Sequence, residues 1–223
     1  MQKMMSPFEA AWAEIQSRRP QGQYMGGSTG ALGFDLEPGR FVAKRGNHPQ
    51  HVLNEYDMNQ YLSMMGVGVP RAQMFQDERG PLMLTEFQQG RHVRPDTDRQ
   101  QVANDMLAHA LIGNWDVTGM HNDNALILPD GRVSYVDLGG SGPWRAQGAP
   151  KGNQWGEHVN ETETLRRRNP WYADVSDEDI QQQYNRMGGQ YGLLTGLNQV
   201  NWNDPNTRDM MQRRIMSLQP WLG

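Results

Sequence analysis

The spacing of apolar residues changes near residue 90 of this chain. Before that point, short segments alternate apolar and polar side chains, as β-strands do. Beyond it, apolar residues recur every three or four positions, as they do on one face of a helix. The strands predicted in the first part are residues 40–44, 71–75 and 82–87. The pattern predicts a single α+β domain in two lobes, a small β-rich lobe over about 1–89 and a mostly helical lobe over about 90–223.

Two helices and a hairpin complete the predicted β-rich lobe. Residues 7–17 should form the first helix, because Ser6 and Glu9 have the spacing of a capping box. Residues 48–65 carry apolar side chains at helical spacing and are followed by a glycine-rich break. Between these helices, residues 23–34 contain a glycine-rich turn and predict a hairpin.

The second lobe should begin with one long helix and a short hairpin. Apolar positions predict the helix over 98–115, so that Asp116 lies where it ends. Residues 125–128 and 133–136 predict the hairpin, and Asp137 follows its second strand directly. The predicted hairpin is therefore flanked by two carboxylates, Asp116 before its first strand and Asp137 after its second.

Composition and charge exclude several classes of function. The chain has no cysteine, so disulfides, thiolate zinc sites and cysteine nucleophiles are absent. Its net charge is −4 and its one short basic run is Arg166-Arg167-Arg168, which gives no basic face for nucleic acid. No signal peptide and no transmembrane segment is visible. We therefore expect a soluble protein, either cytoplasmic or secreted or injected by a non-classical route.

Two features of the first lobe suit the binding of phosphate groups. The turn Gly26-Gly27-Ser28-Thr29-Gly30 would let the backbone approach an anion closely, although a plain hairpin turn explains it equally well. Lys44 ends the next strand and Glu55 follows on the next helix, an order that would hold the ammonium in place. Each charge taken alone is typical of a protein surface, and only the combination favours a site.

Hard oxygen ligands gather around the predicted hairpin of the second lobe. Asp116 and Asp137 flank a segment that also contains Asn122, Asp123 and Asn124. Carboxylate and amide oxygens suit Mg²⁺ better than zinc. Helix capping by Asp116 and an Asx turn at 123–124 would explain these residues singly. Those structural roles do not explain their position beside Asp137, so the sequence favours a metal site.

Three short motifs resemble elements of protein kinases. They are Asp137-Leu138-Gly139, which resembles the Asp-Phe-Gly element, Val42-Ala43-Lys44, which resembles the strand lysine, and Thr85-Glu86-Phe87 in the place of the hinge. The stretch from Gly113 to Asp137 is similar to atypical kinases of the HipA-like toxin and type II phosphatidylinositol 4-kinase families. Asn114-Trp115-Asp116-Val117 and the segment Trp144 to Gly152 resemble a kinase-like domain of bacterial effectors and phage head-morphogenesis polyproteins. The resemblance covers about residues 23–171.

The resemblance implies a reduced two-lobed protein-kinase-like fold with ATP and Mg²⁺ as cofactors. It implies Lys44 on the α- and β-phosphates with Glu55 as its partner, the turn Gly26 to Gly30 over the phosphates, backbone groups around Glu86 and Phe87 on adenine, Asp116 on the acceptor hydroxyl, and Asn124 and Asp137 on Mg²⁺. The implied activity is that of an effector- or toxin-type protein kinase, acting on a Ser, Thr or Tyr hydroxyl of a protein that a host could supply. A lipid or small-molecule kinase, a nucleotidyl (AMP) transferase and an inactive nucleotide-binding scaffold stay open as alternatives.

The sequence departs from the kinase pattern in several places. Asn114-Trp115-Asp116 replaces the usual His-Arg-Asp, and Asn124 follows Asp116 by eight residues where five are common. This longer loop leaves Asn122 or Asp123 as alternative metal ligands. Glu55 comes only eleven residues after Lys44, which predicts a short or differently entered helix. No Ala-Pro-Glu-like end of an activation segment is visible, so regulation through such a segment is not expected.

Overall fold

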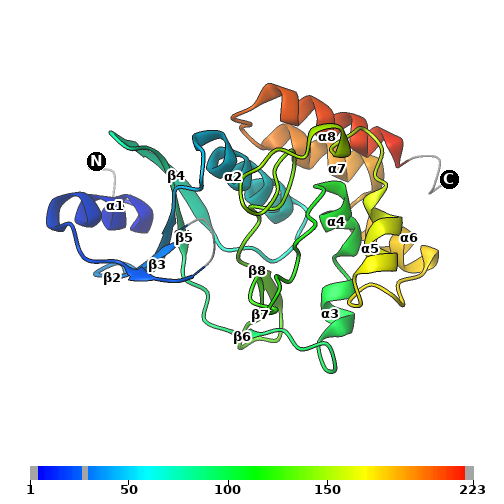
Figure 1. Ribbon diagram of the computed structural model, residues 1–223, viewed down its shortest axis with the longest axis horizontal. Helices are drawn as coiled ribbons and strands as arrows, with labels where there is room; N and C mark the ends of the chain where they lie inside the picture. The colour runs from blue at the N-terminus through cyan, green and yellow to red at the C-terminus, as the bar shows by residue number, and fades with distance from the viewer. Residues whose placement is uncertain (1–4, 27–29, 219–223) are drawn as a thin grey trace.

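The computed structural model describes residues 5–26 and 30–218, which form a β-sheet lobe and a helical lobe (Figure 1). The sheet is antiparallel, with strand order β1-β2-β3-β5-β4. Its strands are β1 (Gln23–Tyr24), β2 (Leu32–Leu36), β3 (Gly39–Lys44), β4 (Ala72–Asp77) and β5 (Gly80–Glu86). All three strands predicted from alternation are present, and the predicted hairpin at 23–34 is the pairing of β1 with β2.

Two helices cover opposite faces of this sheet (Figure 1). Helix α1 (Pro7–Arg18) begins with the predicted capping box at Ser6 and packs Phe8 against Phe41 of β3, with ring centroids 5.4 Å apart. Helix α2 (Pro49–Met64) lies on the other face. Because side chains alternate along a strand, Phe41 faces α1 while Lys44 faces α2. The alternation seen in the sequence thus points the lysine at the helix that carries Glu55.

The helical lobe contains a small second sheet and six helices among the residues that the structure describes. The sheet has the order β6 (Arg91–His92), β7 (Ala125–Ile127), β8 (Val133–Tyr135), and the pairing of β7 with β8 confirms the predicted second hairpin. The helices are α3 (Arg99–Ala103), α4 (Met106–Leu111), α5 (Glu161–Arg168), α6 (Asp177–Arg186), α7 (Gly189–Gln199) and α8 (Pro205–Ser217), with a 3-10 turn η1 (Gly152–Gln154). Over residues 5–26 and 30–218, no helix combines the length and the apolar character that crossing a bilayer requires.

Helix α2 also belongs to the core of the helical lobe. Its Met58, Tyr61 and Leu62 are fully buried among the apolar side chains of that lobe. The Tyr61 hydroxyl donates to the carbonyl of Leu193 in α7 at 3.3 Å. The helix is sixteen residues long, so the short spacing from Lys44 to Glu55 reflects a tight approach to the helix and not a short helix.

The single helix predicted over 98–115 is wrong, because α3 and α4 are separated at Asn104 and Asp105. The side chain of Gln183 from α6 occupies the break: it donates to Ala103 O at 3.1 Å and accepts from Leu107 N at 2.8 Å. These two backbone groups would bond to each other in a continuous helix. A side chain inserted into the helical ladder is a known cause of such breaks.

Replacing Gln183 by methionine should therefore lower the free energy of unfolding by about 2–4 kcal/mol, because two buried backbone groups lose their partner. Urea denaturation measures the change. The matched control is Gln182→Met on the exposed side of α6, which should stay within about 0.5 kcal/mol of the parent. Equal effects of the two substitutions would contradict a structural role for the Gln183 amide.

Candidate active site

A buried lysine lies between two carboxylates where the sheet meets α2. Lys44 Nζ is 2.7 Å from Glu55 Oε1 and 3.2 Å from Asp137 Oδ1. The side chains of Lys44 and Glu55 are almost fully buried, whereas the side chain of Asp137 is 32% exposed. Three residues singled out in the sequence thus form one cluster, with Asp137 on its open side.

The opposite charges of Lys44 and Asp137 stabilise each other's ionised forms. Burial alone would lower the pKa of Lys44, but Asp137 and Glu55 outweigh it and hold this pKa above its ordinary value. Burial likewise opposes ionisation of Asp137, yet Lys44 and the Gly139 N–H keep the pKa of that carboxyl below its usual range. Burial raises the pKa of Glu55, whose Oε2 has no hydrogen-bond partner within the part of the chain that the structure describes. The ammonium and the Asp137 carboxylate are therefore both charged at neutral pH.

One polar face of α2 holds the loop that follows Asp137. His51 Nε2 donates to Gly139 O at 2.7 Å, Asn54 Nδ2 donates to Ser141 O at 3.1 Å, and Glu55 Oε1 accepts from Leu138 N at 3.3 Å. Asn54 and Glu55 lie on the same helix face as His51 because they follow it by three and four positions. Sequence reasoning missed His51 and Asn54. The signal was their spacing from Glu55 on a helix that had to be buried on two sides.

The loop after α4 places Asp116 beside Asn124. Gly113, at φ +61°, ends the helix in the left-handed region, and the side chain of Asn114 then accepts from Asp116 N at 3.1 Å. Asn124 Nδ2 donates to Asp116 O at 2.8 Å, which closes the loop in spite of its unusual length. Gly119 permits this closure, since an added Cβ would come within 2.3 Å of Asp123 Oδ1.

The loop residues differ in their freedom to bind a cation. Asn122 Oδ1 accepts from the Trp171 indole at 3.3 Å, so this alternative ligand is already engaged. Asn124 uses its nitrogen toward Asp116, which leaves its oxygen for a cation. Asp137 receives both Lys44 and the Gly139 N–H on Oδ1, which leaves Oδ2. Burial, followed by the charges of Asp137 and Asp123, raises the pKa of Asp116.

This donor set fits Mg²⁺ held together with phosphate groups. Among residues 5–26 and 30–218, no three His, Cys, Asp or Glu side chains are grouped so that they could hold a metal alone. Mg²⁺ is commonly bound by one or two protein oxygens, with phosphates and water completing its shell. Asn124 and Asp137 together offer such a partial set, so the residues present fit the ion.

The glycine-rich turn is described only at its two ends. Gly26 and Gly30 have φ of +88° and +68°, and an added Cβ at either would meet nothing within 4 Å. Glycine is therefore required there by backbone conformation, not by crowding. Gly27, Ser28 and Thr29 lie outside the described residues, so their predicted contact with phosphate stays a prediction.

The backbone donors of the expected hinge are already used by the sheet. Glu86 N donates to Arg71 O and Phe87 N donates to Arg40 O, both at 3.0 Å. The Glu86 carboxylate pairs with the Arg71 guanidinium, and the Arg40 guanidinium lies 4.0 Å from the centroid of the Phe87 ring. Adenine contacts from these two N–H groups would have to replace sheet hydrogen bonds. The contact of adenine with backbone groups around Glu86 and Phe87 therefore stays a prediction. If adenine accepts from backbone N–H groups, residues after Phe87 would have to donate them.

A cavity of about 640 Å³ opens beside the loop that follows α4. Its lining combines two indole rings, those of Trp115 and Trp171, with polar side chains that include Thr118, Thr164 and Arg168. Trp115 directly precedes Asp116. The cavity therefore borders the loop that carries Asp116, although Asp116 itself is not one of its lining residues.

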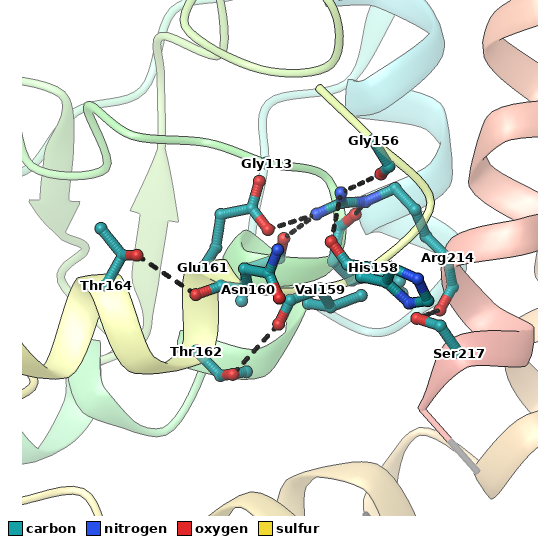
Figure 2. A network of polar contacts seen from close by, with 12 residues as sticks. Gly113, Gly156, His158, Val159, Asn160, Glu161, Thr162, Thr164, Arg214 and Ser217 are labelled. Atoms are coloured by element: carbon teal, nitrogen blue, oxygen red, sulfur yellow. Dashed lines mark hydrogen bonds and ion pairs between the residues drawn. The ribbon is translucent and has the colours of Figure 1, made fainter. Parts of the chain in front are cut away.

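A buried arginine binds backbone carbonyls at the end of α4. Figure 2 shows its contacts with Glu161, Gly156 and His158. Arg214 of α8 is fully buried and pairs with Glu161 Oε2 at 2.7 Å. Its other hydrogen bonds go to the carbonyls of Ala110, Leu111, Gly156 and His158, at 2.6 to 3.2 Å. Because Ala110 and Leu111 close α4, this network sets where the loop to Asp116 begins.

Comparisons with known proteins support the fold alone. No protein-family profile matches the sequence, and no curated protein matches it. The crystal structure of a Helicobacter pylori proinflammatory kinase, CtkA, is similar, with a TM-score of 0.57 and 10% identity over 91% of each chain. HipA of Shewanella oneidensis MR-1, solved with HipB and operator DNA, gives a TM-score of 0.44 at 10% identity over 100% of this chain and 72% of that one, which is too low to carry an argument. The chain thus has the expected mixed α+β, two-lobed, kinase-like fold.

Proposed function

We propose that this protein is an ATP-dependent phosphotransferase, and specifically a protein kinase that acts on a Ser, Thr or Tyr hydroxyl. The observation that carries the proposal is the cluster of Lys44, Glu55 and Asp137, next to the loop that joins Asp116 to Asn124. Buried charges are costly, and a protein that only binds a partner has no need to gather them in one place. The cluster therefore disfavours an inactive scaffold.

In this proposal the protein acts by positioning groups and balancing charge. Lys44 binds the α- and β-phosphates while Glu55 holds its ammonium. Asn124 and Asp137 would hold Mg²⁺, which neutralises phosphate charge when bound. The acceptor oxygen forms a bond to the γ-phosphorus as the bond to the leaving ADP oxygen breaks, and Asp116 takes the hydroxyl proton. The raised pKa of Asp116 makes it a better proton acceptor at neutral pH.

The remaining assignments are part of the same proposal. The turn from Gly26 to Gly30 covers the phosphates, backbone groups around and after Phe87 meet adenine, and the acceptor enters through the cavity lined by Trp115 and Trp171. The lobe boundary lies near residue 90. The similarity of the sequence to kinase-like domains of bacterial effectors supports a host protein as acceptor.

Incubation with γ-labelled ATP and Mg²⁺, alone and with a cell lysate, tests this function. Label should appear on protein and fall at least about 100-fold with Lys44→Met, because the phosphates lose their fixed cation. The exposed-charge control Arg79→Met should keep the label. Label on lipid or a small molecule, or transfer from α-labelled ATP, would replace the protein kinase by one of the alternative transferases. Absence of any transfer and of ATP binding would overturn the proposal.

A further inference from the structure

Lysine is rare in this chain, which has three lysines and eighteen arginines. Two of the three, Lys44 and Lys151, lie in the described part, and both are buried, at 6% and 4% exposure. The exposed Lys or Arg side chains of that part are thus all arginines. In the described part, lysine stands where a compact ammonium is enclosed by protein, which draws attention to Lys151 as well as to Lys44.

The ammonium of Lys151 is surrounded by three backbone carbonyls. Nζ donates to Gly113 O at 2.6 Å, to Gly140 O at 2.8 Å and to Gly142 O at 2.9 Å. An ammonium has three N–H donors and no acceptor, so each hydrogen has one partner here. A neutral amine has only two N–H groups and would leave one carbonyl unpaired. The planar guanidinium of arginine does not offer three donors from one centre.

These carbonyls belong to the two loops that carry the proposed chemistry. Gly113 lies three residues before Asp116, whereas Gly140 and Gly142 follow Asp137 by three and five residues. One side chain therefore joins the backbone before Asp116 to the backbone after Asp137. A direct bond from Gly142 N to Ile112 O, at 2.7 Å, ties the same two segments.

A small hairpin over residues 143–151 delivers Lys151 to this position. Lys151 N donates to Pro143 O at 2.7 Å, Arg145 N donates to Ala149 O at 2.8 Å, and Trp144 and Pro150 form a β-bridge. The hairpin turns the chain back on the loop it has just left. The Trp144-to-Gly152 motif, to which sequence analysis gave no chemical role, is thus the segment that returns an ammonium to the site.

The surroundings of Lys151 are aromatic and charged. Its Nζ lies 4.5 Å from the centroid of the Trp115 ring, and the Arg145 guanidinium lies 5.4 Å from the same centroid. Burial lowers the pKa of Lys151 to about 7; Glu161 of α5 opposes this shift, while Arg214 of α8 and Arg145 of the hairpin add to it. The charge of Lys151 is therefore sensitive to pH near neutrality.

We propose that Lys151 is a positioning residue, whose ammonium holds the loop before Asp116 and the loop after Asp137 at a fixed separation. It touches no reacting atom and acts through the backbone of both loops. Loss of its proton removes one of the three hydrogen bonds and loosens this connection. The kinetic consequence rests on the proposed function, whereas the connection between the loops does not.

Hydrogen exchange tests the connection without any assay of activity. Lys151→Met keeps an unbranched side chain and removes the three N–H donors. Amides in 113–117 and 138–142 should then exchange at least tenfold faster, while exchange in α1 and in the five-stranded sheet should not change. Arg145→Met is the matched control, because Arg145 also stacks on Trp115 but donates its side chain to Gln154. Unchanged exchange in either loop, or equal acceleration throughout the chain, would overturn the proposal.

Titration of the parent protein decides the question if Lys151→Met does not fold. With only three lysines, ¹³C-labelled lysine ε-carbons give a spectrum that Lys44→Met helps to assign. An ordinary lysine titrates near pKa 10.4. The Lys151 signal should titrate at a clearly lower pH, and the loop amides should shift with the same midpoint. The proposed role would be contradicted if the loop amide shifts did not follow the Lys151 titration, or if Lys151 titrated like an exposed lysine.

Kinetics then separate positioning from mere stability. Lys151→Met should lower kcat by about 10–100-fold, because small displacements of reacting groups are costly, while KM for ATP changes less than about threefold. The parent rate should fall as pH rises through the Lys151 midpoint, and the variant should lack this decline. A loss of thermal stability with unchanged kcat would assign Lys151 a structural role only. If the parent transfers no phosphate but exchange rises in both loops, the proposed function fails and the connection stands.

Discussion

Asp137→Asn should lower phosphoryl transfer by at least about 1,000-fold, the largest loss expected from any single change in this protein. The amide has the volume of the carboxylate and can still accept from Gly139 N, so the loop should keep its shape. The substitution removes a negative charge 3.2 Å from Lys44 and an anionic ligand for the cation. Both losses act on the groups that would neutralise the phosphates.

The matched control for this prediction is Asp123→Asn, which removes a neighbouring carboxylate. Asp123 acts on Asp116 through its charge, so its loss should change the rate by less than about tenfold and make Asp116 ionise at lower pH. Initial rates with labelled ATP at several Mg²⁺ concentrations measure both variants. An equally large loss for Asp123→Asn, with a raised Mg²⁺ requirement, would identify Asp123 as a metal ligand. Retention of activity by Asp137→Asn would exclude the proposed site.

Arg214→Leu should have the largest effect on stability, a loss of about 3–5 kcal/mol in the free energy of unfolding. The change leaves Glu161 buried without its cation, and it removes the donors for the carbonyls that end α4. An unpaired buried carboxylate costs more than the ion pair gains. Urea denaturation at neutral pH measures the loss.

The adjacent Arg213 provides the control for Arg214. Its side chain is 52% exposed and lies 3.8 Å from Glu157, so Arg213→Leu should cost less than about 1 kcal/mol. The double variant Arg214→Leu/Glu161→Leu should be more stable than Arg214→Leu, because no unpaired carboxylate is then buried. Similar losses for the two arginines, or no recovery in the double variant, would show that the buried pair does not anchor α4.

The sequence alone predicted the elements whose signals are local. The capping box of α1, the alternation in β3 and the turn between β7 and β8 each involve residues a few positions apart, and all are present. The meeting of Lys44 with Glu55 could be predicted for a similar reason, since a strand and the next helix face each other across a short connection.

Features that depend on distant parts of the chain could not be predicted in this way. The break between α3 and α4 is occupied by Gln183, a residue eighty positions from Ala103. The role of Lys151 depends on the carbonyl directions of two loops, which no residue pattern records. The engaged N–H groups of Glu86 and Phe87 follow from how far the sheet pairing extends. In each case the missing information was tertiary geometry. The scarcity of lysine was a signal for position 151 that the sequence reasoning did not use.

The placement of α2 has a consequence for how this protein could be controlled. Met58, Tyr61 and Leu62 root the helix in the helical lobe, and withdrawing them would cost roughly 1.5–3 kcal/mol for each side chain. A movement of α2 that separates Glu55 from Lys44 would therefore have a large free-energy cost. The five-stranded sheet also packs on α2, through the face opposite α1 (Figure 1). The Lys44–Glu55 ion pair is therefore held from two sides, because Glu55 lies on a helix anchored in the helical lobe and Lys44 lies on a strand of the sheet that packs on this helix.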